Sequence, residues 1–201
     1  MKKCKNENVI GFVGTFQTEK SIYIATEYCN GGDLDHYLQK KKRLTEDEAT
    51  DFLKQILNGF KGLHEAEAMH RDFKSANILM HNGECKIADL GFSKQMEKKS
   101  VTTTLLGTSV TMAPEILWER PYGFKADIWS IGVVYYQMLY GTYPFLGVNE
   151  KDILKKIKNS RPNFKGVNIT DEAKDFIERC LTIDPSDRID WDEIYEHPLL
   201  A

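Results

Sequence analysis

The sequence predicts an α+β fold, in which a small strand-rich beginning precedes a mainly helical body. The first forty residues contain short runs of β-branched and aromatic residues. From Thr45 onward, apolar residues recur at three- and four-residue spacing, which is the period of an amphipathic helix. Because strands and helices are segregated along the chain, a doubly wound parallel sheet is not expected.

Two strands are expected near the N-terminus, over residues 9–16 and 21–28. The polar residues 17–20 connect them, so they should pair as an antiparallel hairpin. Residues 30–33, Asn-Gly-Gly-Asp, end the second strand. With so few strands, such a hairpin exposes a sheet edge and an apolar face, and we expect poor solubility or cover from a further N-terminal segment.

The helical body should begin with a helix that Thr45 caps, since Glu48 stands three residues later and completes a capping box. Short apolar pairs in residues 68–90 predict two further strands around the turn signal His-Asn-Gly at 81–83. A polar stretch at 93–104 predicts an exposed loop. Further helices are expected over residues 125–140, which are apolar nearly all round, and over residues 149–159, 170–181 and 190–197.

Composition narrows the function classes. The chain has 201 residues, 41% of them hydrophobic and 28% charged, which suits one ordinary globular domain and excludes disorder. Its net charge of −3 gives no global basic field, so no nucleic-acid partner is expected. The four cysteines form no CxxC pair, so we expect free thiols. We also expect no membrane span and a cytoplasmic location, with the nucleus as an alternative, because no apolar run approaches about 20 residues and no signal core is present.

The informative segment is residues 70–77, His-Arg-Asp-Phe-Lys-Ser-Ala-Asn, followed by Asp-Leu-Gly at 89–91. Two acids, a lysine and an asparagine on loops between short strands suit phosphoryl transfer from a metal-bound nucleotide. One carboxylate accepts the proton of the attacking hydroxyl and the lysine neutralises phosphate charge. The amide and the second carboxylate offer the hard oxygen ligands that Mg²⁺ prefers. Each residue alone could have a purely structural role, such as a turn cap or a solvated side chain. The whole set at this spacing is not explained in that way.

This segment resembles the catalytic loop and metal-binding triplet of the eukaryotic protein kinases. The resemblance continues in order, through Ala-Pro-Glu at 113–115, Asp-Ile-Trp-Ser-Ile-Gly at 127–132 and Arg188. It implies a protein-kinase-like fold, with a largely helical C-terminal lobe at 29–201 and a truncated strand-rich remnant of the N-terminal lobe and hinge at 1–28. It also implies ATP and Mg²⁺ as cofactors and a protein hydroxyl as acceptor.

The resemblance assigns roles at the catalytic loop. Asp72 is implied as the base, Lys74 as the phosphate-neutralising cation, and Asn77 with Asp89 as the Mg²⁺ ligands. Lys74 and Thr108 resemble the serine/threonine-specific branch, in which Thr108 would hydrogen-bond Asp72 and Lys74.

The resemblance also assigns the adenine pocket. Thr26 is implied as the gatekeeper, and backbone groups of Glu27 and Cys29 would hydrogen-bond the base. Asp33 would reach the ribose, and Leu79 would pack beneath the ring. Without the catalytic loop, the glycines after this strand could equally mark a simple turn.

Three structural features are implied as well. Asp127 begins the central buried helix, and Glu115 should form a buried ion pair with Arg188. Arg71 beside Asp72 is the family's sign of activation by an upstream kinase, whose phosphate on the loop would pair with Arg71. The candidate acceptors are Ser100, Thr102, Thr103 and Thr104. The hydroxyl groups of these residues could equally serve only to keep the loop solvated.

The sequence departs from the family in places. No GxGxxG loop precedes a strand, since Gly11 and Gly14 have the wrong spacing, and no Val-Ala-Ile-Lys strand is present. Ser75 and Ala76 replace a common Pro-Glu pair. The alternative to an active serine/threonine kinase is therefore a catalytically inactive kinase-like binding or regulatory module. The sequence of residues 86–91 and 107–140 resembles that of the autophagy-initiating kinases.

Overall fold

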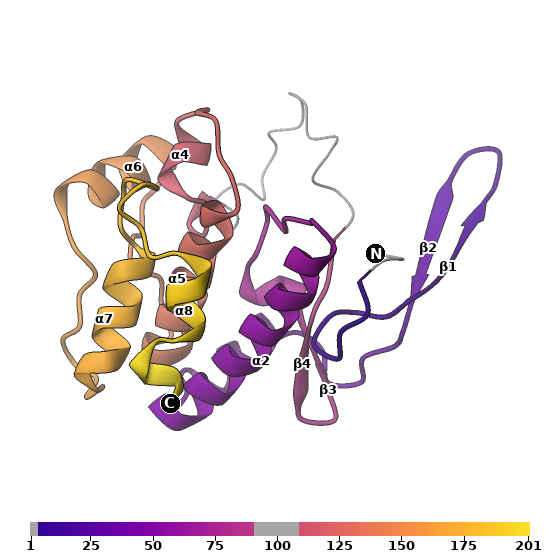
Figure 1. Cartoon of the computed structure of the whole chain (residues 1–201), viewed down its shortest axis with the longest axis horizontal. Coiled ribbons are helices and arrows are strands. Elements are labelled where there is room, and N and C mark those ends of the chain that lie inside the picture. Colours follow the sequence, from indigo (N-terminus) through magenta and orange to yellow (C-terminus); the bar gives the residue numbers. More distant parts are fainter. Residues whose placement is uncertain (1–3, 91–108) are drawn as a thin grey trace.

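The computed structural model describes residues 4–90 and 109–201. Figure 1 shows a helical body from which one β-hairpin projects, so the α+β prediction is confirmed. The elements follow in this order: β1 (Phe12–Gln17), β2 (Ile22–Thr26), α1 (Leu34–Lys41), α2 (Glu46–Glu65), η1 (Ser75–Asn77), β3 (Ile78–His81), β4 (Glu84–Ile87), α4 (Pro114–Leu117), α5 (Lys125–Tyr140), α6 (Glu150–Asn159), α7 (Asp171–Cys180), α8 (Trp191–Tyr195) and η2 (Pro198–Leu200).

Helix α5 is the centre of the body. Its residues 126–139 are all buried, as the apolar sequence predicts, and α2 and α7 pack against it. The helix ends at Gly141, whose φ is 67°. A Cβ at this position would lie 2.1 Å from the Lys42 carbonyl oxygen, so only glycine fits the turn that brings α1 and α5 together.

Helix α2 confirms the predicted capping box. The Thr45 side chain accepts from the Glu48 backbone N–H, and the Glu48 carboxylate accepts from the Thr45 N–H. One face of the helix is fully buried, with Leu53, Ile56 and Phe60 in the core. Helix α2 packs against β4, and so positions the β3–β4 hairpin together with the loops on either side of it.

The β3–β4 hairpin pairs Ile78 with Ile87 and His81 with Glu84, as expected around the turn at 82–83. Asn82 and Gly83 both have positive φ, at 52° and 90°, which two-residue hairpin turns of this kind require. The hairpin therefore fixes the ends of the segments on which the candidate catalytic residues lie.

The β1–β2 hairpin is antiparallel, as predicted, but it begins later than expected. The first strand starts at Phe12 because residues 8–10 pair with β4 instead, through Ile10 N–H to Ile87 O and Ile87 N–H to Asn8 O. Val9 is buried in the helical core. The segment before β1 thus belongs to the body by its contacts, and only the hairpin itself projects (Figure 1).

Some helices differ from the expectations. The sequence did not predict α1, an eight-residue helix with only Leu34 and Leu38 buried, which Asp33 caps through the His36 N–H. Nor did it predict the single turn α4. The two C-terminal helices are shorter than expected, at Asp171–Cys180 and Trp191–Tyr195.

All four cysteines are free thiols, as expected. Within residues 4–90 and 109–201, no helix combines the length and the apolar character that crossing a membrane requires.

Candidate active site

The catalytic-loop candidates converge on Asp72. Lys74 donates from Nζ to Asp72 Oδ2 at 2.8 Å. Asn77 donates from Nδ2 to the Asp72 backbone carbonyl at 2.8 Å and lies 3.4 Å from Oδ2. The structure therefore brings together three of the four residues that the sequence marks as catalytic.

The second carboxylate oxygen of Asp72 has a different environment. Oδ1 is buried and accepts no hydrogen bond from any residue that the structure describes. A buried acceptor without a donor is costly, and such groups concentrate where function requires them. The Asp72 side chain as a whole is 40% exposed, so an incoming hydroxyl group can reach this carboxylate, whose Oδ1 has no other donor among the described residues.

The backbone of the catalytic loop is held by Asp127, at the start of α5. Its two carboxylate oxygens accept from the backbone N–H groups of His70, at 2.9 Å, and Arg71, at 2.8 Å. Arg71 has a φ of 70°, so these bonds hold an uncommon backbone conformation directly before Asp72. Burial raises the pKa of Asp127, while the two backbone donors oppose the rise.

His70 connects the same loop to the segment that carries Asp89. Its Nε2 lies 2.9 Å from the Ala88 carbonyl oxygen, while Nδ1 is buried without a partner in the described residues. Burial lowers the pKa of His70, so the neutral ring with a proton on Nε2 is favoured. The neutral His70 side chain therefore links the catalytic loop to the segment that carries Asp89.

Asn77 and Asp89 lie on neighbouring segments. The Ala88 N–H donates to the Asn77 carbonyl at 2.8 Å, and Asp89 follows with an exposed side chain and a φ of 63°. Because the Asn77 amide nitrogen faces Asp72, its oxygen is left as an acceptor. The described residues hold no group of three or more His, Cys, Asp or Glu that could bind a metal by themselves. Two oxygen ligands nevertheless suit Mg²⁺, which usually takes one or two protein ligands and fills its shell with phosphate oxygens and water.

Two of the adenine-pocket candidates are brought together. Asp33 and Leu79 form an antiparallel bridge, flanked by hydrogen bonds between Gly31 N–H and Met80 O and between Met80 N–H and Gly32 O. A Cβ at Gly31 would lie 2.7 Å from the Met80 Cβ, so the close approach requires glycine there. The carboxylate of Asp33 caps α1 from this position.

The remaining adenine-pocket candidates follow at the end of β2. Thr26 is exposed, and Cys29 is half-buried, which raises the pKa of its thiol. The Glu27 carboxylate accepts from the Gly11 N–H at 2.7 Å and pairs with Lys86. The Gly11 hydrogen bond is the main reason that the pKa of Glu27 is lowered. These residues line the junction between the hairpin and the body.

The expected buried ion pair between Glu115 and Arg188 is present and bidentate. Nη1 and Nη2 of Arg188 donate to Oε1 and Oε2 of Glu115 at 2.8 and 2.9 Å, and the two residues are 1% and 4% exposed. The guanidinium also donates to the carbonyls of Lys125, Thr182 and Ile183. The pair thus locks α4 to the segment before α8.

Several predicted residues lie outside the described part of the chain. They are Ser100, Thr102, Thr103, Thr104 and Thr108, together with the whole polar stretch at 93–104.

Sequence reasoning missed a polar cluster beside the catalytic loop. Ser75 donates to Asp35 of α1 at 2.9 Å, and Gln137 of α5 donates to the same carboxylate oxygen at 3.1 Å. The only sequence signal was the presence of Ser75 at a position where the resembled family commonly has proline.

The comparisons with known proteins agree with this geometry. The model of the protein kinase domain matches residues 1–200. The chain belongs to the protein kinase family, which confirms the resemblance and the kinase-like fold.

The relatives are protein kinases, and two of the three described next are named as serine/threonine kinases. The chain is 33% identical to the serine/threonine-protein kinase atg1 of Dictyostelium discoideum, with all of the chain and 31% of the relative covered. It is 34% identical to the serine/threonine-protein kinase ULK1 of Homo sapiens, with all of the chain and 20% of the relative covered. It is 38% identical to calcium-dependent protein kinase 3 of Plasmodium yoelii yoelii, with 98% of the chain and 38% of the relative covered. The chain thus spans less than two fifths of each of these relatives. They place it among the serine/threonine kinases and near the autophagy kinases.

Proposed function

We propose that this chain is the catalytic part of a serine/threonine protein kinase, which transfers the γ-phosphoryl group of ATP to a serine or threonine hydroxyl of a protein. The observation that carries the proposal is the arrangement at Asp72. Oδ2 is paired with Lys74, Oδ1 has no donor in the described residues, and the side chain is 40% exposed, so this carboxylate can receive the acceptor hydroxyl.

The catalytic-loop residues have roles that their positions support, and Thr108 takes its role from the resemblance. The Asp72 carboxylate orients the hydroxyl and accepts its proton, and Lys74 places positive charge beside the transferred phosphoryl group. Asn77 and Asp89 would hold Mg²⁺, which neutralises phosphate charge when ATP is bound. Thr108 would complete the hydrogen bonds around Asp72 and Lys74.

The adenine would bind where the hairpin joins the body. Backbone groups of Glu27 and Cys29 would pair with the base, Thr26 would limit its depth, and Leu79 would pack against the ring. Asp33 would reach the ribose. We further propose the division into a small-lobe part at 1–28 and a large lobe at 29–201.

Regulation and location are part of the same proposal. An upstream kinase would phosphorylate Ser100, Thr102, Thr103 or Thr104, and the phosphate would pair with Arg71. The proposed location is cytoplasmic, with protein substrates as the partners and no nucleic acid.

The test is phosphate transfer from Mg²⁺-ATP to serine/threonine peptides, measured with the longest protein that the gene encodes. Asp72→Asn should lower kcat at least about 100-fold, because general base catalysis contributes this much or more. The exposed Asp47→Asn on α2 is the matched control and should leave kcat unchanged. A wild-type protein without any turnover, or an Asp72→Asn variant as active as wild type, would contradict the proposal.

The second candidate is a catalytically inactive binding or regulatory module. The observation that favours it is the lack of a glycine-rich loop and of a lysine strand in this sequence, the parts that cover and anchor the phosphates in kinases. It predicts that residues 1–201 show no ATP-dependent transfer but still bind a protein partner. Any turnover by this chain that is lost in Asp89→Ala would exclude it.

A further inference from the structure

The polar cluster beside the catalytic loop joins three elements that are far apart in the sequence. It consists of Asp35 on α1, Ser75 at the start of η1, Gln137 on α5 and Tyr143 just after α5. Asp35 Oδ1 accepts from Ser75 Oγ at 2.9 Å and from Gln137 Nε2 at 3.1 Å. Gln137 Nε2 also lies 3.2 Å from the Tyr143 hydroxyl. One carboxylate oxygen therefore ties the catalytic loop to two helices.

Two members of the cluster are buried, while Asp35 and Tyr143 are half-buried. Ser75 is 1% exposed and Gln137 is 6% exposed. Burial raises the pKa of the Tyr143 phenol, and the negative charge of Asp35 adds to this rise. Hydrogen bonds of the Tyr143 phenol with Ser75 and Gln137 partly offset it. Because buried polar groups are costly when unpaired, the loss of one member would force its neighbours to move or remain unsatisfied.

Ser75 stands between the residues that act on Asp72. Lys74 directly precedes it, and Asn77 ends the same 3₁₀ turn. That turn has no side-chain cap of its own, since Lys74 makes no capping hydrogen bond. The Ser75 hydroxyl is thus a tertiary anchor for a turn whose two ends hold the Asp72 carboxylate.

We infer that Asp35 is a positioning residue for phosphoryl transfer, which acts through Ser75 to set the backbone that carries Lys74 and Asn77. The inference deepens the proposed function and rests on it. The proline that commonly occupies the position of Ser75 in the resembled family could not make this hydrogen bond, because it has no hydroxyl to donate. The inference also gives Gln137 a role, since its amide donates to the same oxygen of the Asp35 carboxylate as Ser75 does.

The test compares Asp35→Ala and Ser75→Ala with the conservative variant Asp35→Asn. Misplacement of reacting groups by about 1 Å costs up to about 100-fold in rate, so kcat should fall about 10- to 100-fold in both alanine variants. KM for ATP should stay within about twofold, because the nucleotide contacts are not changed. Asp35→Asn keeps an oxygen acceptor for Ser75 and should retain most of the activity. The double variant Asp35→Ala/Ser75→Ala should fall no further than Asp35→Ala, because both substitutions remove the same bond.

The matched control is Gln39→Ala on the same helix. Gln39 Nε2 donates to the other oxygen of the same carboxylate, Asp35 Oδ2, at 2.8 Å from an exposed position. Its removal should leave kcat unchanged. A loss of activity in Gln39→Ala equal to that in Asp35→Ala would show that α1 as a whole is disturbed, and would overturn the inference.

A second measurement does not depend on turnover. Amide hydrogen exchange over residues 72–78 should speed up in Asp35→Ala and Ser75→Ala but not in Gln39→Ala, because the turn loses its anchor. If the wild-type protein shows no turnover, the proposed function fails, and the exchange data alone decide whether Asp35 holds this turn. Unchanged exchange and kcat in both alanine variants would overturn the inference. A rise in peptide KM with constant kcat would do so too, since it would place Asp35 in contact with the substrate.

Discussion

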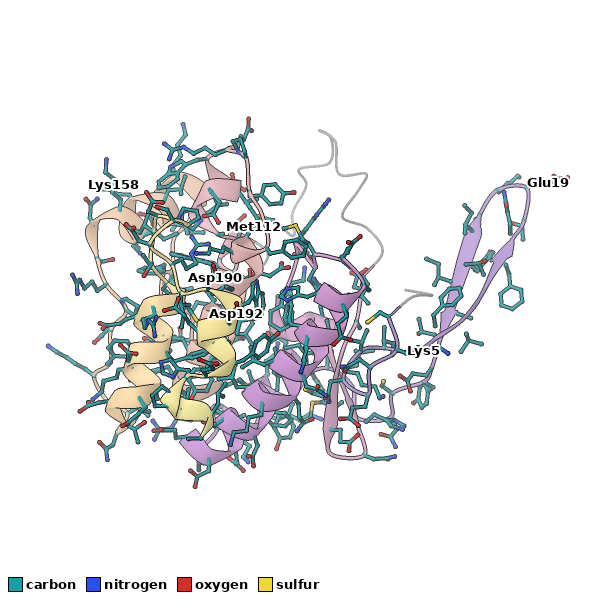
Figure 2. The ribbon with its side chains drawn as sticks, viewed as in Figure 1. Lys5, Glu19, Met112, Lys158, Asp190 and Asp192 are labelled. Carbon is teal, nitrogen blue, oxygen red and sulfur yellow. The ribbon has the colours of Figure 1, made fainter. Side chains whose placement is uncertain are left out.

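The apolar side chains of the β1–β2 hairpin and those of the helical body around α5 differ sharply in their exposure to solvent. In the body, Trp129, Phe60 and Phe176 are fully buried. In the hairpin, Val13, Phe16 and Ile22 are each more than three fifths exposed. Figure 2 shows the same contrast, with side chains crowded together in the body and standing apart along the hairpin, whose tip carries Glu19.

The contrast shows that regular pairing is not the same as stability. The hairpin has a regular ladder of pairs from Gly14 and Ala25 to Gln17 and Ile22, with one register shift between Phe12 and Gly14. A two-stranded sheet without a covered face is marginal in water, because it buries almost no apolar surface. The free energy of folding must therefore come from the body, and the hairpin must depend on what covers it.

The most direct test of this difference in stability compares two phenylalanines, one in the body and one in the hairpin. Phe60 on α2 is 0% exposed and Phe16 on β1 is 64% exposed. Phe60→Ala should lower the free energy of unfolding by about 3–5 kcal/mol through lost burial and a cavity. Phe16→Ala should change it by less than about 0.5 kcal/mol, as surface substitutions do. Urea unfolding followed by circular dichroism measures both, and a similar cost at the two positions would contradict the division into a stable body and an uncovered hairpin.

The next prediction concerns a charged pair inside the body. Glu115→Ala should destabilise the protein by about 3–5 kcal/mol, because Arg188 would remain buried with an uncompensated charge. The exposed pair between Arg179 and Glu193 is the control, and Arg179→Ala should cost less than about 1 kcal/mol. Equal losses in the same urea experiment would mean that the buried location of Glu115 does not matter.

The comparison also explains how far the sequence could predict the structure. Local signals were reliable, since the Thr45 capping box and the apolar run of α5 depend on residues close together in the chain. Helix α1 was missed because it buries only Leu34 and Leu38 and is otherwise polar, so that tertiary packing rather than periodicity defines it. The start of β1 was wrong because Val9 pairs with Ile87, a partner that no local pattern reveals.

The candidate site divides in the same way. Asp72, Lys74 and Asn77 lie within six consecutive residues, so one segment of sequence was enough to place them together. The Asp35 cluster could not be predicted, because Ser75 and Gln137 lie 40 and 102 residues from Asp35 in the chain. Nothing in the local sequence around Asp35 indicates that its carboxylate faces the catalytic loop.

The smallest effect expected is a dependence of the body's stability on pH. His64, near the end of α2, packs against the rings of Phe124 and Trp191, and its buried Nε2 has no partner in the described residues. Burial lowers the pKa of His64, and the negative charge of Asp127 only partly opposes this. The unfolded chain therefore binds the proton more readily than the folded protein, so stability is full above about pH 6.5 and declines as the pH falls below it.

His70 acts in the same direction, because burial also lowers its pKa. Each histidine contributes at most about 1.4 kcal/mol of unfolding free energy per pH unit. His64→Phe keeps the aromatic contacts and removes one titrating group, so the fall in melting temperature between about pH 6.5 and 5 should become shallower. His36→Gln is the control, since that side chain is exposed on α1 and its loss should leave the slope as it is. If His64→Phe keeps the full wild-type slope, His64 does not supply the dependence.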